Sequence, residues 1–472
     1  MITRIARKEM TEMFRDGRFR WASAIVLGLI VIATLTGVRS FRALDAEQAA
    51  AQTAMRGFWV EQGAKNPHSA AHYGLWVFKP KMPLSFIDQG VDAFTGVTTW
   101  LEAHKQNEFT RRPAMDQASV ARFGEWTAAA VLQLLVPLLI IMLAFSAFTA
   151  ERESGTLRQL AALGVPMPQL VRGKALGTAA ALAVVVVPAT LLGVLTLALG
   201  AGFSRGADDF VRFGAMVAVY LAYFLVVLVI TLAVSARSRS SRAALLTLLG
   251  FWTVTSLIAP RAVTDVARRV HPTVSSFAFQ KAVADDLANG IDGHNPADAR
   301  RKAVEAQALK EYRVISIDAL PVNFDAIAMQ ASEEYGNQVF DKHFNGLYDS
   351  YRAQNAVTQL GAVVAPLLAV RSLSMGLAGT DVEQHRDFAT KAESYRRGLV
   401  AFANNYFRDN TQTGAWDWKA PPEVWAKYPA FQYEAPPVSE TLAPQRRAIV
   451  LLAGWFVLAL LALVSAPSFR LD

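Results

Sequence analysis

The stretch TAAAVLQLLVPLLIIMLAFSAFTA, residues 127–150, contains no charged side chain in 24 positions. A bilayer core about 30 Å thick requires roughly 20 apolar residues of helix, because a helix rises about 1.5 Å per residue. The stretch is long enough and apolar enough to cross a membrane. We therefore predict a membrane-spanning helix at this position.

Five further runs share this length and composition. With the first run they predict six spans, at 21–38, 127–150, 175–199, 214–234, 243–260 and 448–466. The run at 21–38 is longer than the core of a signal peptide and follows 20 residues of chain, so we do not expect it to be removed.

One more apolar block, 360–379, could be taken for a seventh span. It contains Arg371, and a charge at mid-membrane costs on the order of 2.5–3.5 kcal/mol. Pro366 would also break a backbone hydrogen bond of a spanning helix. We therefore predict an interfacial or core helix there.

The overall composition agrees with a membrane protein. Hydrophobic residues make up 53% of the chain and charged residues 18%, which is too apolar for an ordinary soluble protein. The net charge of +8 comes from basic residues beside the apolar runs and not from one basic face, so we expect no nucleic-acid partner. The chain has no cysteine, which excludes disulfides, thiolate metal sites and cysteine nucleophiles.

The basic residues also predict the orientation, because cytoplasmic loops are enriched in lysine and arginine. Basic side chains gather before the first span, after the second and after the fourth, although Arg39 and Arg42 follow the first span and argue mildly against this orientation. We predict a multi-pass protein of a bacterial-type cytoplasmic (inner) membrane with both termini in the cytoplasm.

The segments between the spans complete the predicted organisation. Residues 1–20 are predicted to form an amphipathic helix, which we call the elbow helix, because apolar residues recur there at helical spacing. Residues 151–174 are predicted to form a cytoplasmic loop, and 467–472 a cytoplasmic tail. Two segments, 39–126 and 261–447, lie outside and look mainly helical. The predicted fold is an all-α integral membrane protein with six transmembrane helices and two mainly helical extracytoplasmic segments.

The sequence contains no motif that would supply the energy for transport across a membrane. The six spans contain no ionisable residue of the kind that ion-coupled carriers bury. The phosphate-binding pattern GxxxxGK[ST] is absent, since the nearest fragment, Gly173-Lys174-Ala175, lacks the upstream glycine and the hydroxyl residue. No enzyme motif such as GxSxG or HExxH occurs. If the chain belongs to a pump, a separate ATPase subunit must bind ATP and Mg. We expect no cofactor on this chain.

The loop after the second span carries the most specific pattern. It reads ERESGTLRQL at 151–160, LGVPMP at 163–168 and RGK at 172–174. This pattern resembles the first cytoplasmic loop of ABC-2-type transporter permeases, in which a short helix docks on the ATPase. The resemblance implies coupling roles for Glu151, Glu153, Gly155, Thr156, Leu157, Leu160, Leu163, Gly173 and Lys174. Leu157, Leu160 and Leu163 share one helical face; the alternative is a solvated loop that only obeys the charge rule.

The resemblance extends along the chain, through Arg7-Lys8-Glu9 near the start and residues 373–388 near the end. The large segment before the last span resembles the ABC-2 subfamily related to permeases of copper-enzyme maturation systems. The resemblance implies the permease subunit of an ATP-driven exporter, working with an ABC ATPase and a second, identical or paralogous permease. The alternative is a membrane-anchored assembly subunit whose outside domain binds a partner without substrate crossing.

Polar and aromatic residues near the spans are candidates for a pathway or gate. They are Gln133, Thr253, Thr255, Ser256, Trp425, Phe431 and Tyr433. The polar ones are equally able to hydrogen-bond between helices, and the aromatic ones to form a belt at the membrane surface.

The histidines give a weaker signal. His68 and His72 have the i, i+4 spacing that places two ligands on one helical face. Pro67 and Gly74 make a regular helix there uncertain, so we predict no metal site.

Overall fold

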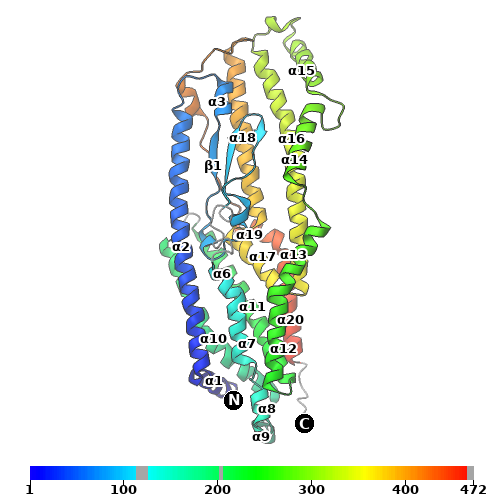
Figure 1. Cartoon of the computed structure of the whole chain (residues 1–472). Coiled ribbons are helices and arrows are strands. Elements are labelled where there is room, and N and C mark those ends of the chain that lie inside the picture. The colour runs from blue at the N-terminus through cyan, green and yellow to red at the C-terminus, as the bar shows by residue number, and fades with distance from the viewer. Residues whose placement is uncertain (113–125, 201–205, 465–472) are drawn as a thin grey trace.

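The computed structural model describes residues 1–112, 126–200 and 206–464 (Figure 1). It is mostly helical and elongated, and six helices are long and apolar enough to cross a membrane. They are Gly17–Val60, Ala128–Glu153, Met167–Leu199, Ala207–Arg237, Ser241–Val270 and Val438–Ala462. The prediction of six spans is confirmed. The predicted tail at 467–472 and residues 465 and 466 of the predicted last span lie outside the described residues.

The spans are built from the following elements. The first span is α2 (Gly17–Val60), and the second consists of α6 (Ala128–Ala130), η3 (Val131–Leu135), α7 (Val136–Ala144) and α8 (Thr149–Glu153). The third span is α10 (Met167–Gly200) and the fourth is α11 (Ala207–Arg237). The fifth consists of α12 (Ser241–Thr253), η4 (Val254–Ile258) and α13 (Ala259–Val270), and the sixth of α19 (Val438–Leu442), η8 (Ala443–Gln445) and α20 (Arg446–Val464). We call these helices together the span bundle. α1 (Ile2–Arg15) lies against one end of the span bundle, where the first span begins (Figure 1).

The centre of the span bundle is formed by α7 and α11. In the most apolar windows of these two spans 56% of the residues are buried, against 22% for α10 and α20. Val136 and Ile140 of α7 meet Phe224 and Val227 of α11 in one hydrophobic cluster. The peripheral helices leave large apolar side chains exposed, as a lipid-facing surface requires.

The first span continues far beyond its predicted end at residue 38. α2 has 44 residues, so at about 1.5 Å per residue it is about 66 Å long. The extension from Arg39 contains no proline and is rich in alanine, which favours helix. The segment predicted as separate and extracytoplasmic thus begins as part of the same rigid helix.

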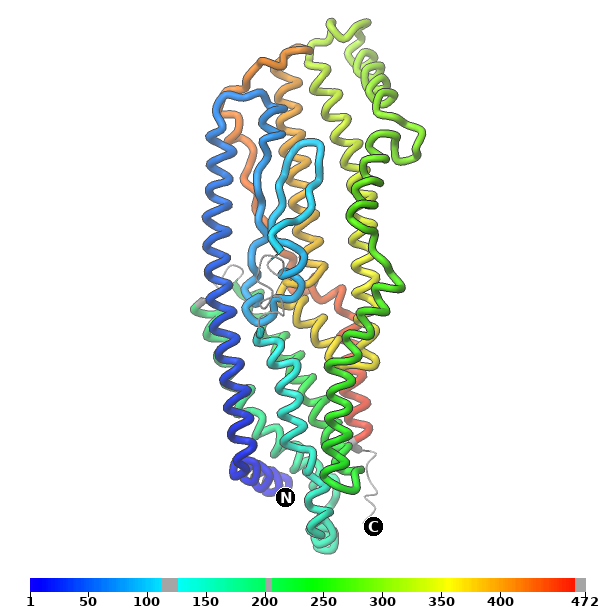
Figure 2. The backbone as a smooth tube through the Cα atoms, viewed as in Figure 1, coloured from blue at the N-terminus to red at the C-terminus, as the bar shows by residue number. Residues whose placement is uncertain are grey.

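The rest of the chain forms a tall domain beyond the other end of the span bundle, which we call the distal domain. Its helices are α3 (Pro67–Tyr73), η1 (Pro83–Phe86), α4 (Asp92–Thr95), α14 (Ser276–Asn289), α15 (Ala297–Tyr312), η5 (Ile317–Ala319), α16 (Phe324–Leu360), η6 (Gly361–Val363), α17 (Pro366–Ala378), α18 (Val382–Asn410), η7 (Pro422–Lys427). In Figure 2, α16 descends toward the span bundle and α18 returns beside it.

A small antiparallel sheet that the sequence reasoning did not predict lies between α2 and α18 (Figure 1). Its strands are β1 (Leu75–Phe78), β2 (Thr98–Glu102) and β3 (Lys105–Gln106), in the order β1-β2-β3. Trp76 pairs with Trp100 across the first two strands. The strands are too short for periodicity to separate them from loops.

α17 occupies the apolar block at 360–379. It has 13 residues, is not one of the six spans, and is buried along most of its length, including Leu367, Leu373 and Leu377. It packs against α11 and α20 where the span bundle meets the distal domain. The prediction of an interfacial or core helix in place of a seventh span is confirmed, and the helix lies in the core.

Candidate functional site

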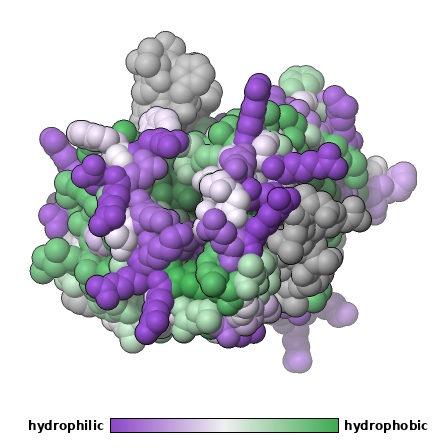
Figure 3. Space-filling model, turned by 90° about the horizontal axis from the view of Figure 1, so that it is seen from below, coloured by the Kyte–Doolittle hydropathy of each residue, from purple (hydrophilic) through white to green (hydrophobic). Residues whose placement is uncertain are grey.

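The end of the second span and the loop that follows it form two short helices, at the end of the span bundle where α1 lies. α8 is followed by Gly155 and then by α9 (Thr156–Ala162), which protrudes below the neighbouring helices (Figure 1). Gly155 has φ 76°, a left-handed conformation that glycine adopts without steric cost, and it makes the sharp corner. Figure 3 looks at this end and shows hydrophilic side chains projecting around apolar patches.

A buried ion cluster, which we call the near cluster, ties this loop to two other elements. Lys174 of α10 is only 1% exposed, and its Nζ lies 2.7 Å from Glu9 Oε1 of α1 and 2.9 Å from Glu151 Oε1 of α8. Lys8 Nζ lies 3.4 Å from the same Glu151 oxygen. A buried charge requires such partners, so Lys174 fixes α1, α8 and α10 relative to one another.

Glycines in α10 allow α1 to lie close. A Cβ at Gly173 would stand 2.6 Å from Ile5 Cβ, and one at Gly177 would stand 2.7 Å from the Ala6 carbonyl oxygen. Only glycine therefore fits at these two positions without a shift of the elbow helix. Gly173 thus has a packing role against α1, and its coupling role stays a prediction.

A second set of contacts joins α8 to the connection between α11 and α12. Glu153 accepts hydrogen bonds from the Ser241 backbone N–H, 2.7 Å, and hydroxyl, 2.8 Å. Arg152 donates to the carbonyl oxygens of Ser238, 2.6 Å, and Ala236, 2.8 Å, at the end of α11. These contacts satisfy backbone groups that helix ends leave unpaired. These contacts link α8 directly to the ends of the fourth and fifth spans.

The three leucines predicted to face an ATPase have different surroundings. Leu157 is 3% exposed and belongs to the hydrophobic cluster of the span bundle. Leu160 is half-buried against that cluster, and Leu163 is 79% exposed. Leu157 therefore holds α9 to its own chain, and Leu163 is the one freely presented. Thr156 is half-buried, and its hydroxyl lies 2.9 Å from that of Ser154 at the α8–α9 corner.

A second candidate site lies in the middle of the chain, on two π-helical turns. Gln133 lies in η3, and Pro137 four residues later has no N–H for the Gln133 carbonyl. The Tyr223 hydroxyl, 3.4 Å away, donates to that carbonyl instead, and Trp252 Nε1 donates to the Leu134 carbonyl at 3.1 Å. Such π-turns occur frequently at functional sites.

The Gln133 side chain begins a buried polar chain that crosses from the span bundle to the distal domain. It donates to the Tyr220 hydroxyl, 3.1 Å, which lies 2.9 Å from the Ser374 hydroxyl of α17. Ser374 donates to Asp88 Oδ2 at 2.6 Å, and Arg371 Nε donates to Gln133 Oε1 at 3.2 Å. Burial raises the pKa of Asp88, more than the Ser374 hydroxyl and the Gly90 N–H lower it.

The other predicted polar residues lie in the fifth span. Thr255 and Ser256 are buried on η4, and the Thr255 hydroxyl donates a hydrogen bond to the Phe251 carbonyl. Thr253, just before η4, is half-buried. A cavity of about 60 Å³ lies among the first four spans, lined by Thr34, Ala189, Met216 and other mostly apolar residues. This volume holds a few waters at most and no organic substrate.

The predicted aromatic gate residues lie in the distal domain. Trp425 is fully buried, donates to the Gly63 carbonyl at 2.7 Å, and packs edge-on against Trp59 of α2. Phe431 and Tyr433 pack on Phe388 of α18 in the same hydrophobic cluster. The structure thus gives these residues a packing role, and it separates them from Gln133, Thr255 and Ser256.

Several residues of these sites were missed from the sequence. Glu9, Asp88 and Tyr220 come from segments far apart in the chain, and far from Arg371 and Ser374 of α17, so no local pattern joins them. The one signal was Arg371 inside an apolar block, because a charge there requires a buried partner.

Comparison with known families covers most of the chain. Residues 3–306 match the family described as "ABC-2 family transporter protein". Residues 276–434 match one described as "Domain of unknown function (DUF3526)". No curated protein matches this chain in sequence.

Proposed function

Because this chain belongs to the ABC-2 family of transporter membrane proteins, we propose that it is the permease subunit of an ATP-driven exporter, with α8 and α9 as the docking element of the ATPase. Membrane proteins of this family carry no ATPase domain and generally pair with ABC ATPase subunits. In this proposal, the end of the span bundle that carries α1, α8 and α9 lies in the cytoplasm, and the distal domain lies outside. The subfamily related to copper-enzyme maturation remains a proposal from the sequence alone.

One observation carries this proposal: α9 is exposed at its tip, but α8 at its base contacts α10, the α11–α12 connection and the elbow helix. Leu163 is 79% exposed, whereas Lys174 is buried between Glu9 and Glu151. Arg152 and Glu153 hold the connection between the fourth and fifth spans. A docked ATPase that moves α9 therefore moves the elbow helix and three spans together.

The transport pathway is proposed to lie between two permease subunits. The cavity of about 60 Å³ within one copy is too small for a substrate. Exposed apolar side chains on α2 and on the fifth span, such as Ile25 and Leu257, leave a surface for either lipid or a second permease. The polar chain from Gln133 to Asp88 supports a role in coupling α17 to the spans, with α17 closing the outer end.

A second candidate function rests on the distal domain. A groove of about 800 Å³ lies between the β2–β3 hairpin and the helices α14 and α16, lined by Trp76, Trp100, Phe279 and Phe340 among others. Such a groove suits a membrane-anchored assembly subunit that binds a partner outside without substrate crossing. The two functions differ in whether a substrate crosses when ATP is hydrolysed.

Affinity purification from native membranes tests the docking proposal. We expect a separate ABC-type ATPase to copurify with the chain, and the isolated chain to hydrolyse no ATP. Leu160→Asp and Leu163→Asp are expected to reduce ATPase recovery about tenfold or more, since an apolar anchor commonly contributes above ~1 kcal/mol and an unpaired charge costs more. Hydrolysis by the isolated chain, or full ATPase recovery with both variants, would overturn the proposal.

Cysteine labelling tests the orientation, because the natural chain has no cysteine. Single cysteines at exposed positions 163 and 315 serve as the pair. We expect an impermeant thiol reagent added outside to label position 315 and not position 163. The reverse pattern would invert the topology and remove the cytoplasmic assignment of α9.

A further inference from the structure

Three histidines of the distal domain form a compact cluster outside the sites described above, which we call the histidine cluster. It consists of His68 and His72 of α3 and His104 of the β2–β3 turn. One ligand nitrogen from each lies within 4.8 Å of the others, and the Nε2 atoms of His68 and His72 are 3.1 Å apart. His72 and His104 are exposed, so the cluster is open to ions from solution.

The local sequence forms the regular helix that had been judged uncertain. The Asn66 side chain caps the first turn by accepting from the backbone N–H groups of His68 and Ser69. Pro67 occupies the first helical position, where its missing N–H costs nothing, and Gly74 ends the helix with φ 59°. The two histidines at i and i+4 therefore lie on one face, as a chelating pair requires.

The third histidine is held next to this pair by the backbone. Ala103 donates its N–H to the Ala71 carbonyl at 3.1 Å, which places the turn against α3. His104 has φ 63°, a left-handed conformation that is uncommon for a residue with a side chain. Such conformations persist where surrounding contacts enforce them, often at binding sites.

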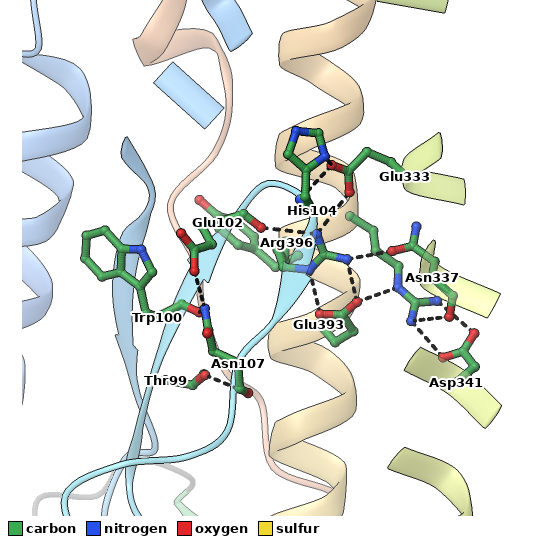
Figure 4. Close-up of polar contacts among 12 residues, drawn as sticks. Thr99, Trp100, Glu102, His104, Asn107, Glu333, Asn337, Asp341, Glu393 and Arg396 are labelled. Carbon is green, nitrogen blue, oxygen red and sulfur yellow. Dashed lines mark hydrogen bonds and ion pairs between the residues drawn. The ribbon is translucent and has the colours of Figure 1, made fainter. Parts of the chain in front are cut away.

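A buried carboxylate fixes the orientation of His104, as Figure 4 shows. Glu333 Oε1 of α16 lies 2.5 Å from His104 Nδ1 and accepts from the His104 backbone N–H at 2.6 Å. Glu333 is 4% exposed and is itself held by Arg396 at 3.3 Å. With Nδ1 engaged, Nε2 is the nitrogen left for a metal, which is the carboxylate–histidine–metal arrangement of many zinc sites.

We propose that His68, His72 and His104 bind a divalent transition-metal ion of the Zn²⁺ class, with Glu333 as the positioning residue of His104. Three imidazoles are a ligand set for Zn²⁺, Cu²⁺ or Ni²⁺ and not for Mg²⁺ or Ca²⁺, which require oxygen ligands. Two nitrogens bound to a tetrahedral Zn²⁺ at about 2.0–2.1 Å lie about 3.3 Å apart. The 3.1 Å separation of the α3 pair is close to this value.

A bound ion would link three elements that come from distant parts of the chain. It would join α3, the β2–β3 turn and, through Glu333, α16.

Zinc binding to the full-length chain is the test, using purified protein in detergent with an affinity tag that contains no histidine. After treatment with chelator, titration with Zn²⁺ should give one ion per chain by calorimetry and elemental analysis, and Mg²⁺ should give no binding. His72→Ala and His104→Ala should each lower the Zn²⁺ affinity by more than the roughly 10–100-fold that loss of an outer partner costs. The His72 side chain is exposed, so the metal-free melting temperature of His72→Ala should stay unchanged, whereas that of His104→Ala should fall, because this variant loses the contact with the buried Glu333.

Matched controls separate the positioning role of Glu333 from a structural one. Glu333→Gln should lower the Zn²⁺ affinity by about 10–100-fold. Glu393→Gln, which also loses an Arg396 contact but touches no histidine of the cluster, should keep full affinity. His294→Ala, an exposed histidine elsewhere, should also change nothing. The proposal would be overturned if the natural chain bound no stoichiometric zinc. It would also be overturned if His72→Ala and His104→Ala bound Zn²⁺ as tightly as the natural chain.

Discussion

The two ends of the molecule each contain a buried ion cluster, and the two clusters differ in how fully they are satisfied. In the distal domain, Arg396 is 1% exposed and donates from Nε and both terminal nitrogens to Glu393, Glu333, Asn337 and the Glu102 carbonyl. We call this group the distal cluster. In the near cluster, Lys174 bridges Glu9 and Glu151, and Glu151 Oε2 is buried with no hydrogen-bond partner among the described residues.

This difference follows from the chemistry of the two cations. A guanidinium has five donors in a fixed plane, which suits a permanent scaffold, whereas an ammonium is a compact charge that can exchange partners. The distal cluster is thus suited to holding the histidine cluster in place. The near cluster joins three helices that the proposed ATPase must shift. Every nitrogen of the Arg396 guanidinium donates a hydrogen bond, which favours a rigid distal cluster. The near cluster leaves a carboxylate oxygen without a partner among the described residues, which is compatible with movement.

The largest effect is expected from Arg396→Met. Removal of the guanidinium takes the fully buried counter-charge from Glu333 and Glu393, which keep only His104 and Arg397 as partners, and loss of such a partner costs about 3–5 kcal/mol. Thermal unfolding of the purified chain should show a correspondingly lower melting temperature. Arg352→Met is the control, because its pair with Glu383 is at the surface and contributes about 0–1 kcal/mol. Equal losses in the two variants would contradict the scaffold role of the distal cluster.

Lys174→Met should have the next largest effect on stability, about 3 kcal/mol, since Lys8 still lies near Glu151. The variant should also lose stimulation of ATP hydrolysis by substrate in the assembled transporter. A triple variant with Glu9→Gln and Glu151→Gln should recover most of the stability, because no charge is left unpaired. The comparison fails if the triple variant also recovers coupling, since coupling would then not depend on the ion pair.

Gly177→Leu tests the close contact between α1 and α10. The added side chain meets the Ala6 backbone, so we expect a loss of about 1–3 kcal/mol or displacement of the elbow helix. Limited proteolysis within residues 1–16 reports the displacement. Gly28→Leu is the matched control, since nothing lies within 4 Å of its Cβ position. Similar protease sensitivity in both variants would argue against a packed elbow.

The smallest effect on stability is expected from Leu163→Asp, within about 0.5 kcal/mol, because its side chain is exposed. Leu157→Asp, in the same short segment, should destabilise the chain by several kilocalories per mole, as it places a charge in the core. Melting temperatures of the two variants, measured without the ATPase, distinguish presentation from packing. A large drop for Leu163→Asp would show that α9 is less open than described.

The elements that the sequence predicted are those whose signal is local. The six spans depend on the composition of single runs, and Arg371 in an apolar block was sufficient to exclude a seventh. The strands at 75–78 and 98–102 were missed because four or five residues carry no reliable period. The extension of α2 was missed because a change from apolar to polar composition ends a span without ending a helix.

The candidate sites were predicted only in part, since their contacts join distant segments. Glu151, Gly173 and Lys174 were identified from one loop, but their partners Glu9 and Ile5 lie in the elbow helix. The leucine spacing predicted one shared face and could not show that Leu157 turns into the core. His104 and Glu333 are 229 positions apart in the chain, so their contact depends on the tertiary fold.

The length of α2 has a mechanical consequence. Its lower end begins after Asp16, whose extended backbone separates it from the elbow helix, and its upper end is keyed to the distal domain by Trp59 and Trp425. A rod of about 66 Å that pivots by about 5° at one end moves its other end by about 6 Å. The first span is thus suited to act as a lever arm: a small rotation beside the near cluster would displace its far end, in the distal domain, by about the length of one helical turn.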